Sequence, residues 1–261
     1  MMSKLENKLK AGLNFLREQY YSYRCSVCNS KIKEYLPLSD SYRENSLKYG
    51  YKYFGENEHI NIKKYTCPNC KASDRDRFYA SFFSNIEKIP KNSQKSLLHV
   101  APSWPLNNKY LIKHFNVITT DLMMPKVDYL LDVEDMVSFE PNKFGYLICS
   151  HVLEHVNNPD KALVELLRVL KPGGKAILMA PINPNIANTI EDPKHTSEEE
   201  RLRYYGQEDH LRLFAKQDFM NRIEKAGFIL ETYGINEFGK KSFQSLGLRE
   251  TSVLYIGKKT K

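Results

Sequence analysis

Apolar residues in the first third of the chain change their spacing three times. The first stretch has leucines at helical spacing behind a Ser-x-x-Glu capping box, which predicts an amphipathic helix over residues 3–20. Residues 20–65 keep no long helical period and hold nine of the 17 tyrosines, so we expect short strands and loops there. Helical spacing returns over residues 74–89, and a polar linker over residues 90–94 follows.

Strands and helices alternate after this linker. Asn158 and Pro159 predict the start of a helix that runs to residue 170, and Gly227 follows the end of another. A further helix is predicted over residues 104–115. Short apolar runs predict strands over residues 96–101, 117–120, 129–131, 146–150, 175–180, 228–234 and 252–256. The alternation predicts an α/β fold, a doubly wound parallel sheet with helices on both faces.

Charge is distributed unevenly between the two parts of the chain. Residues 1–95 hold 18 Lys and Arg against 10 Asp and Glu, whereas residues 96–261 hold 21 of each kind. A net charge of +8 is compatible with a nucleic-acid partner, but the excess positive charge lies entirely in the first part of the chain. Only that part could therefore support nucleic-acid binding. No apolar run approaches the roughly 20 residues of a membrane span. Five cysteines are too few for a disulfide scaffold, so we expect a reducing, cytoplasmic compartment.

Four cysteines form two C-x-x-C pairs, Cys25 with Cys28 and Cys67 with Cys70. Two intervening residues allow both thiolates of a pair to reach one tetrahedral ion, so the two pairs predict a closed, structural zinc site of the zinc-ribbon type. The gap between the pairs is long, which an inserted segment explains. Redox activity and simple packing are the alternatives. We assign residues 1–92 to this zinc-binding module and residues 93–261 to the sheet domain.

Two motifs flank the predicted helix that begins at Pro159. Residues 151–155 read His-Val-Leu-Glu-His, and residues 168–174 read Arg-Val-Leu-Lys-Pro-Gly-Gly. Together with Asp121 and Asp132, they resemble the class I S-adenosylmethionine-dependent methyltransferases. Residues 205–214, Tyr-Gly-Gln-Glu-Asp-His-Leu-Arg-Leu-Phe, are similar to a bacterial branch of this group that also carries an N-terminal C-x-x-C module. The resemblance implies a seven-stranded sheet whose last strand is antiparallel.

The resemblance also implies where S-adenosylmethionine binds. Asp121 would accept hydrogen bonds from the ribose, and Asp132 with Val133 would contact the adenine. The carboxyl ends of parallel strands at a topological switch point are where such nucleosides bind. The turn after the first sheet strand departs from the usual Gly-rich sequence, because it contains no glycine. The full set of predicted cofactor residues is Ala101, Pro102, Ser103, Asp121, Leu122, Asp132, Val133, Ser150 and His151.

The acceptor is least constrained by the sequence. We predict methyl transfer to an oxygen or nitrogen of a small molecule, most plausibly a sugar or polysaccharide precursor, with His210 as the preferred base and His155 as the second candidate. Glu154 and His155 could contribute to a metal site, but two ligands do not define one. An RNA methyltransferase that uses the basic module, and a non-catalytic partner-binding protein, are the alternatives. Nothing in the sequence decides the oligomeric state.

Overall fold

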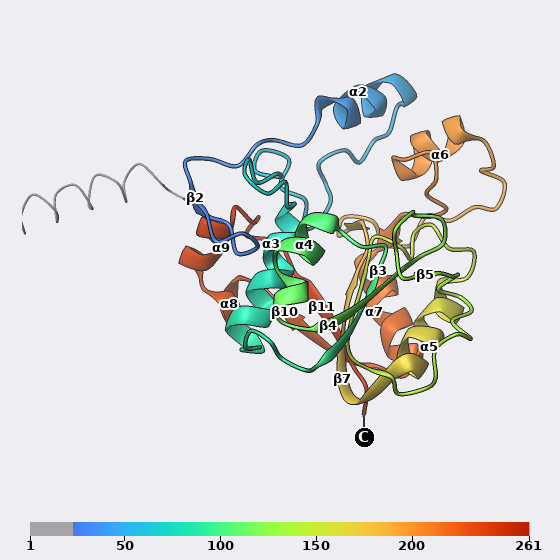
Figure 1. The fold of residues 1–261 in the computed structure, drawn as a ribbon. Coiled ribbons are helices and arrows are strands. Elements are labelled where there is room, and N and C mark those ends of the chain that lie inside the picture. Colours follow the sequence, from blue (N-terminus) through green and yellow to red (C-terminus); the bar gives the residue numbers. More distant parts are fainter. Residues whose placement is uncertain (1–22, 261) are drawn as a thin grey trace, which may run out of the picture.

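Seven strands form the central sheet of the computed structural model, which describes residues 23–260 (Figure 1). From one edge to the other they are β10 (Ile229–Tyr233), β11 (Leu254–Lys258), β7 (Leu170–Met179), β6 (Phe144–Ser150), β3 (Ser96–Val100), β4 (Asn116–Asp121) and β5 (Tyr129–Leu130). β11 runs antiparallel to both of its neighbours, and the pairs from β7 to β5 are all parallel. The predicted helix over residues 3–20 lies outside the described residues.

The strand that follows Gly174 decides the architecture. It belongs to β7, which lies between β11 and β6 in the interior of the sheet. The Lys-Pro-Gly-Gly turn is part of the same strand, and a side chain at Gly174 would lie within 3.0 Å of three neighbouring atoms. This strand order, with the reversed last strand, confirms the predicted class I methyltransferase fold.

Helices cover both faces of the sheet (Figure 1). One face carries α5 (Pro159–Val169) and α7 (Lys216–Lys225). The other carries α3 (Asp74–Ser81), α4 (Trp104–Lys109), α8 (Ile235–Phe238) and α9 (Lys240–Leu246). The Asn158 side chain accepts a hydrogen bond from the Lys161 amide, so α5 begins where its cap predicts.

Two predicted helices are interrupted. The helix expected over residues 74–89 continues beyond α3 as a π-helical turn, η1 (Phe82–Ile86). The helix expected over residues 104–115 ends at Lys109, because Tyr110 leaves the helical conformation, and a 3₁₀ turn, η2 (Leu111–Lys113), follows. Both interruptions are packed beneath the same face of the sheet, where Phe83 contacts Phe115 with ring centroids 4.9 Å apart.

Two further helices lie beyond the carboxyl ends of the sheet strands, at the top of Figure 1. These are α2 (Asp40–Tyr49) and α6 (Glu198–Tyr205). The expectation of only strands and loops over residues 20–65 is wrong for α2. This helix has no buried residue and hence no apolar stripe, and its ends are set by the Ser39 hydroxyl and by Gly50 in the left-handed conformation. The remaining elements are the short strand pairs β1 (Tyr23–Arg24) with β2 (Lys31–Ile32) and β8 (Ile182–Asn183) with β9 (Phe214–Ala215).

The N-terminal segments and the sheet share one hydrophobic core. Glu58 is buried, and its carboxylate accepts hydrogen bonds from Lys216 and from the Tyr255 hydroxyl. The Arg249 guanidinium donates to the carbonyl oxygens of Gly55 and Asn57. The division of the chain at residue 92 stays a prediction. Among the described helices, none has the length and apolarity that crossing a bilayer requires.

Candidate functional site

Two adjoining cavities lie at the carboxyl ends of β3, β4 and β6. The larger opening, of about 420 Å³, is lined by Ala101, Asp121, Leu122, Asp132, Val133 and His151, among others. The second, of about 400 Å³, is lined by Pro102, Ser103 and Ser150 and again by Ala101 and His151. All nine predicted cofactor residues therefore lie at one place in the fold. β3 and β6 are adjacent, and the chain leaves them toward opposite edges of the sheet, so this place is the topological switch point.

Of the two aspartates that the sequence singles out, Asp121 ends β4 and Asp132 lies two residues beyond the end of β5, and each accepts hydrogen bonds within the turn that follows. Oδ1 of Asp121 accepts hydrogen bonds from the amides of Met123 and Met124, at 2.8 and 2.7 Å. Oδ1 of Asp132 accepts from the Glu134 amide at 2.8 Å. Within residues 23–260, the second carboxylate oxygen of either residue has no hydrogen-bond partner. Each aspartate can therefore cap its turn and still accept hydrogen bonds from a ligand.

Ala101 and His151 have strained backbone conformations directly after the carboxyl ends of β3 and β6. Their φ angles are 47° and 57°, in the left-handed region that non-glycine residues rarely occupy. Such a conformation costs about 1–2 kcal/mol and is concentrated at functional sites. Ala101 thus makes the turn that glycine usually makes, with the smallest side chain that has a Cβ.

Helix α3, which the sequence does not assign to the site, covers the second cavity. The hydroxyls of Tyr79 and Ser150 lie 2.7 Å apart, and Ser103 donates to Asp76 at 2.8 Å. Arg75 lines this cavity as well, and its Nε atom is buried without a hydrogen-bond partner in the described residues. The N-terminal part of the chain therefore supplies one wall of the predicted cofactor site.

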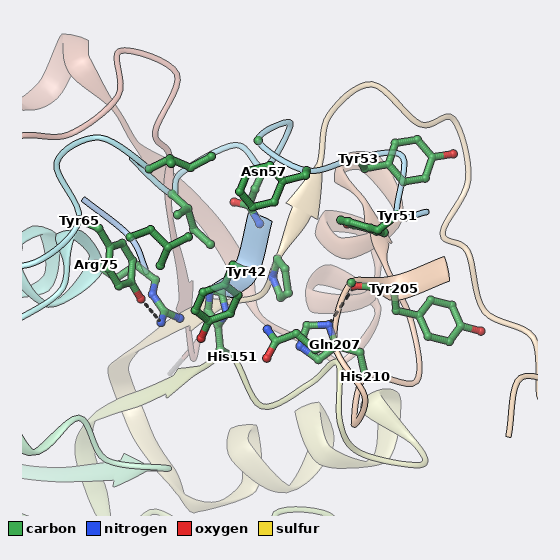
Figure 2. A pocket seen from close by; sticks show the side chains of 17 residues that line it. Tyr42, Tyr51, Tyr53, Asn57, Tyr65, Arg75, His151, Tyr205, Gln207 and His210 are labelled. Carbon is green, nitrogen blue, oxygen red and sulfur yellow. Dashed lines mark hydrogen bonds between the residues drawn. The ribbon is translucent and has the colours of Figure 1, made fainter. Parts of the chain in front are cut away.

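A third, smaller cavity of about 130 Å³ opens on the other side of His151 (Figure 2). Its walls come mainly from α2 and the loops on either side of it, and from the end of α6 and the segment that follows. Arg75 lines both this cavity and the second cavity at the switch point. Its guanidinium lies 3.3 Å from the Tyr65 hydroxyl. Polar groups come from Asn57, Gln207 and His210. The aromatic lining consists of Tyr42, Tyr51, Tyr53, Phe54, Tyr65 and Tyr205.

Gly206 allows the two sides of this aromatic pocket to meet closely. It has a φ of 88°, and a Cβ there would lie 2.9 Å from the ring of Tyr51. Gly206 also ends α6, as the C-terminal cap. Gly206 therefore ends a helix from the second half of the chain and also leaves room for Tyr51, which comes from the first half.

Histidines from three segments converge between the cavities. Nε2 of His59 lies 3.0 Å from Nε2 of His151. Burial, and after it the positive charge of Arg75, lowers the pKa of His59 to about 3 and the pKa of His151 well below its usual value. Both rings are therefore neutral at physiological pH, and one donates to the other. His59 is a site residue that sequence reasoning missed, because it lies 92 residues from its partner.

The predicted catalytic histidines lie beside a buried carboxylate. The ring centroids of His155 and His210 are 4.7 Å apart. Nε2 of His155 is 3.8 Å from Oε1 of Glu154, which is fully buried. Burial raises the pKa of Glu154 to about 8 and lowers the pKa of His210 to about 4. His210 lines the aromatic pocket, whereas His155 lines the cofactor cavity.

Arg212 fixes the loop that carries Glu154 and His155. Its guanidinium is buried and donates to the carbonyl oxygens of Leu153, Val156 and Asn157, and it is paired with Glu191 at 2.7 Å. In addition, the Leu211 amide donates to the Glu154 carbonyl oxygen at 2.8 Å. The segment over residues 205–214 therefore carries His210 and also holds the loop on which the other two side chains lie.

The four cysteines of the C-x-x-C pairs cluster as the sequence predicts. All four sulfurs lie within 4.8 Å of one another, with Cys25 3.7 Å from Cys70 and Cys28 4.0 Å from Cys67. Four thiolates around a zinc ion at about 2.3 Å would lie about 3.8 Å apart, so the donor set fits a tetrahedral ion. Each pair is followed by a left-handed residue, Asn29 or Lys71, so the two turns have the same shape.

Comparison with known proteins shows a likeness to methyltransferases over part of the chain. Residues 114–178, from β4 to the end of β7, match a family model described as a methyltransferase domain. The demethylmenaquinone methyltransferase of Renibacterium salmoninarum is 41% identical over 54 residues, which are 21% of this chain and 23% of that protein. The ubiquinone/menaquinone biosynthesis C-methyltransferase of Hydrogenovibrio crunogenus is 36% identical over 62 residues, 24% of each. The chain thus matches about a quarter of the length of these relatives.

The chain is also similar to solved structures, at lower sequence identity. Phosphoethanolamine N-methyltransferase 2 of Haemonchus contortus, in complex with S-adenosyl-L-methionine, is 16% identical, with a TM-score of 0.47 over 73% of this chain and 53% of that one. The YcgJ protein of Bacillus subtilis is 12% identical, with a TM-score of 0.44 over 70% of this chain and 99% of that one.

Proposed function

We propose that the chain is a methyltransferase that uses S-adenosylmethionine to methylate an oxygen or nitrogen of a small, ring-shaped molecule. The observation that carries this proposal is the joining of two kinds of cavity at His151. His151 lines both cavities at the switch point and the aromatic pocket, and Arg75 lines the second of those cavities and the aromatic pocket. Methyl transfer needs a donor and an acceptor in line, and most of its acceleration comes from such positioning.

The cleft residues fit the proposed cofactor. Asp121 has a carboxylate oxygen to accept from the ribose, and Asp132 with Val133 lies beside it for the adenine. The second cavity would hold the methionine portion, where the unpartnered Nε of Arg75 suits a carboxylate. The cofactor would supply an electrophilic methyl group, and His151 and Arg75, which also line the aromatic pocket, would help to hold it.

The lining of the aromatic pocket supports a ring-shaped acceptor. Tyrosine faces pack against rings, and their hydroxyls, with Asn57 and Gln207, provide hydrogen bonds for an acceptor that carries several polar groups. A sugar or polysaccharide precursor combines both properties, and we propose this class. His210 is the proposed base, because its Nε2 is buried, faces no partner in the described residues and belongs to a neutral ring.

We further propose that Cys25, Cys28, Cys67 and Cys70 bind one structural zinc ion. The four sulfurs leave no open position, so the ion would stabilise the N-terminal segments and would not take part in methyl transfer.

Calorimetric titration with S-adenosylmethionine and with S-adenosylhomocysteine tests the proposed function. We expect both to bind, and we expect Asp121→Asn to weaken binding by about 10–100-fold, because a charged acceptor of hydrogen bonds contributes about 1.5–3 kcal/mol. Asp128→Asn, a carboxylate on the same β4–β5 connection that bonds Thr119 instead, is the matched control. Absence of binding by the unmodified protein would contradict the proposal and favour a non-catalytic relative.

The acceptor class is tested separately. Nucleotide sugars and RNA are incubated with labelled S-adenosylmethionine, and RNA binding is measured at two salt concentrations. Methylation of a sugar that is lost in His210→Ala supports the proposal. RNA binding that is tight and weakens steeply with salt would instead support the RNA alternative, because phosphate contacts release counterions.

A further inference from the structure

Three side chains between the cofactor cavity and the aromatic pocket point their polar atoms toward one another. One ligand atom each of Glu154, His155 and His210 can be chosen so that all lie within 4.8 Å of one another. Glu154 is fully buried, and neither of its carboxylate oxygens has a hydrogen-bond partner in the described residues. Nε2 of His210 is also buried without a partner, in a side chain that is only 2% exposed. Buried polar atoms of this kind are costly unless something binds them.

The outer nitrogen of each histidine is already engaged. Nδ1 of His155 lies 3.2 Å from the Asp209 carboxylate, and Nδ1 of His210 lies 3.3 Å from the Tyr205 carbonyl oxygen. Histidines that bind metal ions nearly always donate their second N–H to a carboxylate or a backbone carbonyl, which fixes the tautomer and leaves the other nitrogen for the ion. His210 has this arrangement, and Nδ1 of His155 lies in ion-pair distance of a carboxylate, so both Nε2 atoms are available as ligands.

The remaining neighbour of the cluster is His151. Its Nδ1 lies 3.3 Å from Oε1 of Glu154, without hydrogen-bond geometry, and its Nε2 is engaged with His59. The same oxygen, Oε1, also lies 3.8 Å from Nε2 of His155, and Oε2 has no hydrogen-bond partner in the described residues. Ligand atoms around one ion at about 2.0–2.2 Å are separated by about 3–4 Å, which matches the last distance.

We propose that Glu154, His155 and His210 bind one divalent transition-metal ion. Two imidazoles and one carboxylate form a donor set of intermediate hardness that suits Zn²⁺, Mn²⁺ or Co²⁺. Three protein ligands leave at least one position open, as in metal sites that act on a substrate. The cluster borders both the aromatic pocket and the cofactor cavity, so the open position faces the place where donor and acceptor meet.

The role of this ion rests on the proposed methyl transfer. An acceptor hydroxyl that binds the ion has a lowered pKa and releases its proton to water. The oxygen lone pair then forms the new O–CH₃ bond, while the electron pair of the S–CH₃ bond remains on sulfur, which changes from a sulfonium to a thioether. A nitrogen that coordinates the ion has no free lone pair, so with the ion bound His210 and His155 would act on the acceptor through it, and water would take the proton in place of His210.

Metal counting tests the inference without any need for turnover. The full-length protein is dialysed to equilibrium against micromolar Mn²⁺, and total zinc and manganese per chain are measured by elemental analysis. We expect the unmodified protein to hold one metal ion more per chain than Glu154→Gln or His210→Ala. His195→Ala removes a histidine that precedes α6 and stacks on Tyr204 outside the cluster, and we expect it to keep the full count.

The midpoint of thermal unfolding is measured as well, because a variant that folds poorly could lose the ion for that reason alone. Adding Mn²⁺ should raise the midpoint of the unmodified protein and of His195→Ala but not that of Glu154→Gln, which preserves the shape of the side chain. Equal metal counts in all four proteins would overturn the inference. So would loss of the additional ion in Cys70→Ser with retention in His210→Ala, because that result would place the ion at the cysteines. Failure of cofactor binding with a normal metal count would instead count against the proposed function.

Discussion

Arg77 shows how one buried side chain joins segments that are far apart in the sequence. Its guanidinium donates to the carbonyl oxygens of Lys64, Tyr65 and Ala72 around the second cysteine pair, and to that of Leu246 at the end of α9. It also stacks on the ring of Tyr35 at 3.7 Å. Arginine suits this position because its planar fork offers five donors in fixed directions.

Replacing Arg77 by methionine should lower the free energy of unfolding by about 3 kcal/mol or more. Methionine retains much of the apolar stem but removes the donor from four carbonyl oxygens, of which that of Ala72 keeps the Cys67 amide as a donor. Each buried group left unsatisfied costs about 1–3 kcal/mol. Urea unfolding measures the loss. Arg203→Met, on the exposed side of α6, is the control, with an expected change within about 0.5 kcal/mol. Similar losses in the two variants would show that the buried network contributes little.

The cysteine turns are the elements on which α3 depends. The second turn is followed directly by the Ser73 cap of α3, and the Ser26 hydroxyl of the first turn donates to the Arg77 carbonyl at 2.6 Å. Arg75 and Tyr79 of the same helix line the proposed cofactor site. An ion at the cysteines would therefore position residues of the site from a distance.

Cys67→Ser should abolish zinc binding and lower the thermal midpoint, because a hydroxyl replaces a thiolate ligand in a fully buried position. It should also weaken S-adenosylhomocysteine binding, since α3 loses its support. Cys149→Ala is the matched control, a fully buried cysteine of β6 outside the cluster, and it should leave the zinc content unchanged. Zinc content that is the same in Cys67→Ser and the unmodified protein would refute the predicted ligand set.

Elements with a buried face were predictable from the sequence, and exposed ones were not. The sheet strands and α5 follow apolar periodicity and an identifiable cap, so their order and type agree with the structure. α2 buries nothing, and its only local signals are Ser39 and Gly50, which the periodicity does not register. The interrupted end of α4 reflects packing around Tyr110, which local propensity does not contain.

The candidate site was predictable as far as it lies on the sheet. Carboxyl ends of parallel strands converge, so Asp121, Asp132 and Ser150 could be grouped from their positions in the sequence. His59 and Arg75 come from segments whose tertiary contacts no local pattern reports. His210 could be placed near the acceptor only by resemblance, and its approach to Glu154 depends on how the loop folds back. The sequence offered one signal that α3 could belong to the site, namely the charged run Asp-Arg-Asp-Arg over residues 74–77, shortly after the second cysteine pair.

The described part of the molecule is organised around contacts of residues 23–92 with the sheet and with the helices that cover it. Phe78 packs against Phe243, Phe82 against Tyr233, and Phe83 against Phe115 and Tyr146. All three phenylalanines are fully buried or nearly so. Burying a phenylalanine contributes about 1.5–3 kcal/mol, so three of them account for a substantial part of a total stability that is typically about 5–15 kcal/mol.

A fragment of residues 93–261 should therefore fail to fold on its own, although it contains every strand of the sheet. Without α3 and η1, one face of the sheet would expose the partners of those phenylalanines, and Tyr255 and Lys216 would lose the buried Glu58. Circular dichroism during heating should show no cooperative transition for the fragment, and S-adenosylhomocysteine should not bind.

Co-expression of residues 1–92 with this fragment should restore both properties, because the contacts between the two pieces do not require a covalent link. This control separates a missing partner from damage caused by the new terminus. A fragment that unfolds cooperatively and binds S-adenosylhomocysteine as tightly as the full chain would show that the sheet is self-sufficient. The N-terminal segments would then act on the acceptor pocket alone, where Tyr42, Tyr51 and Tyr65 line its wall.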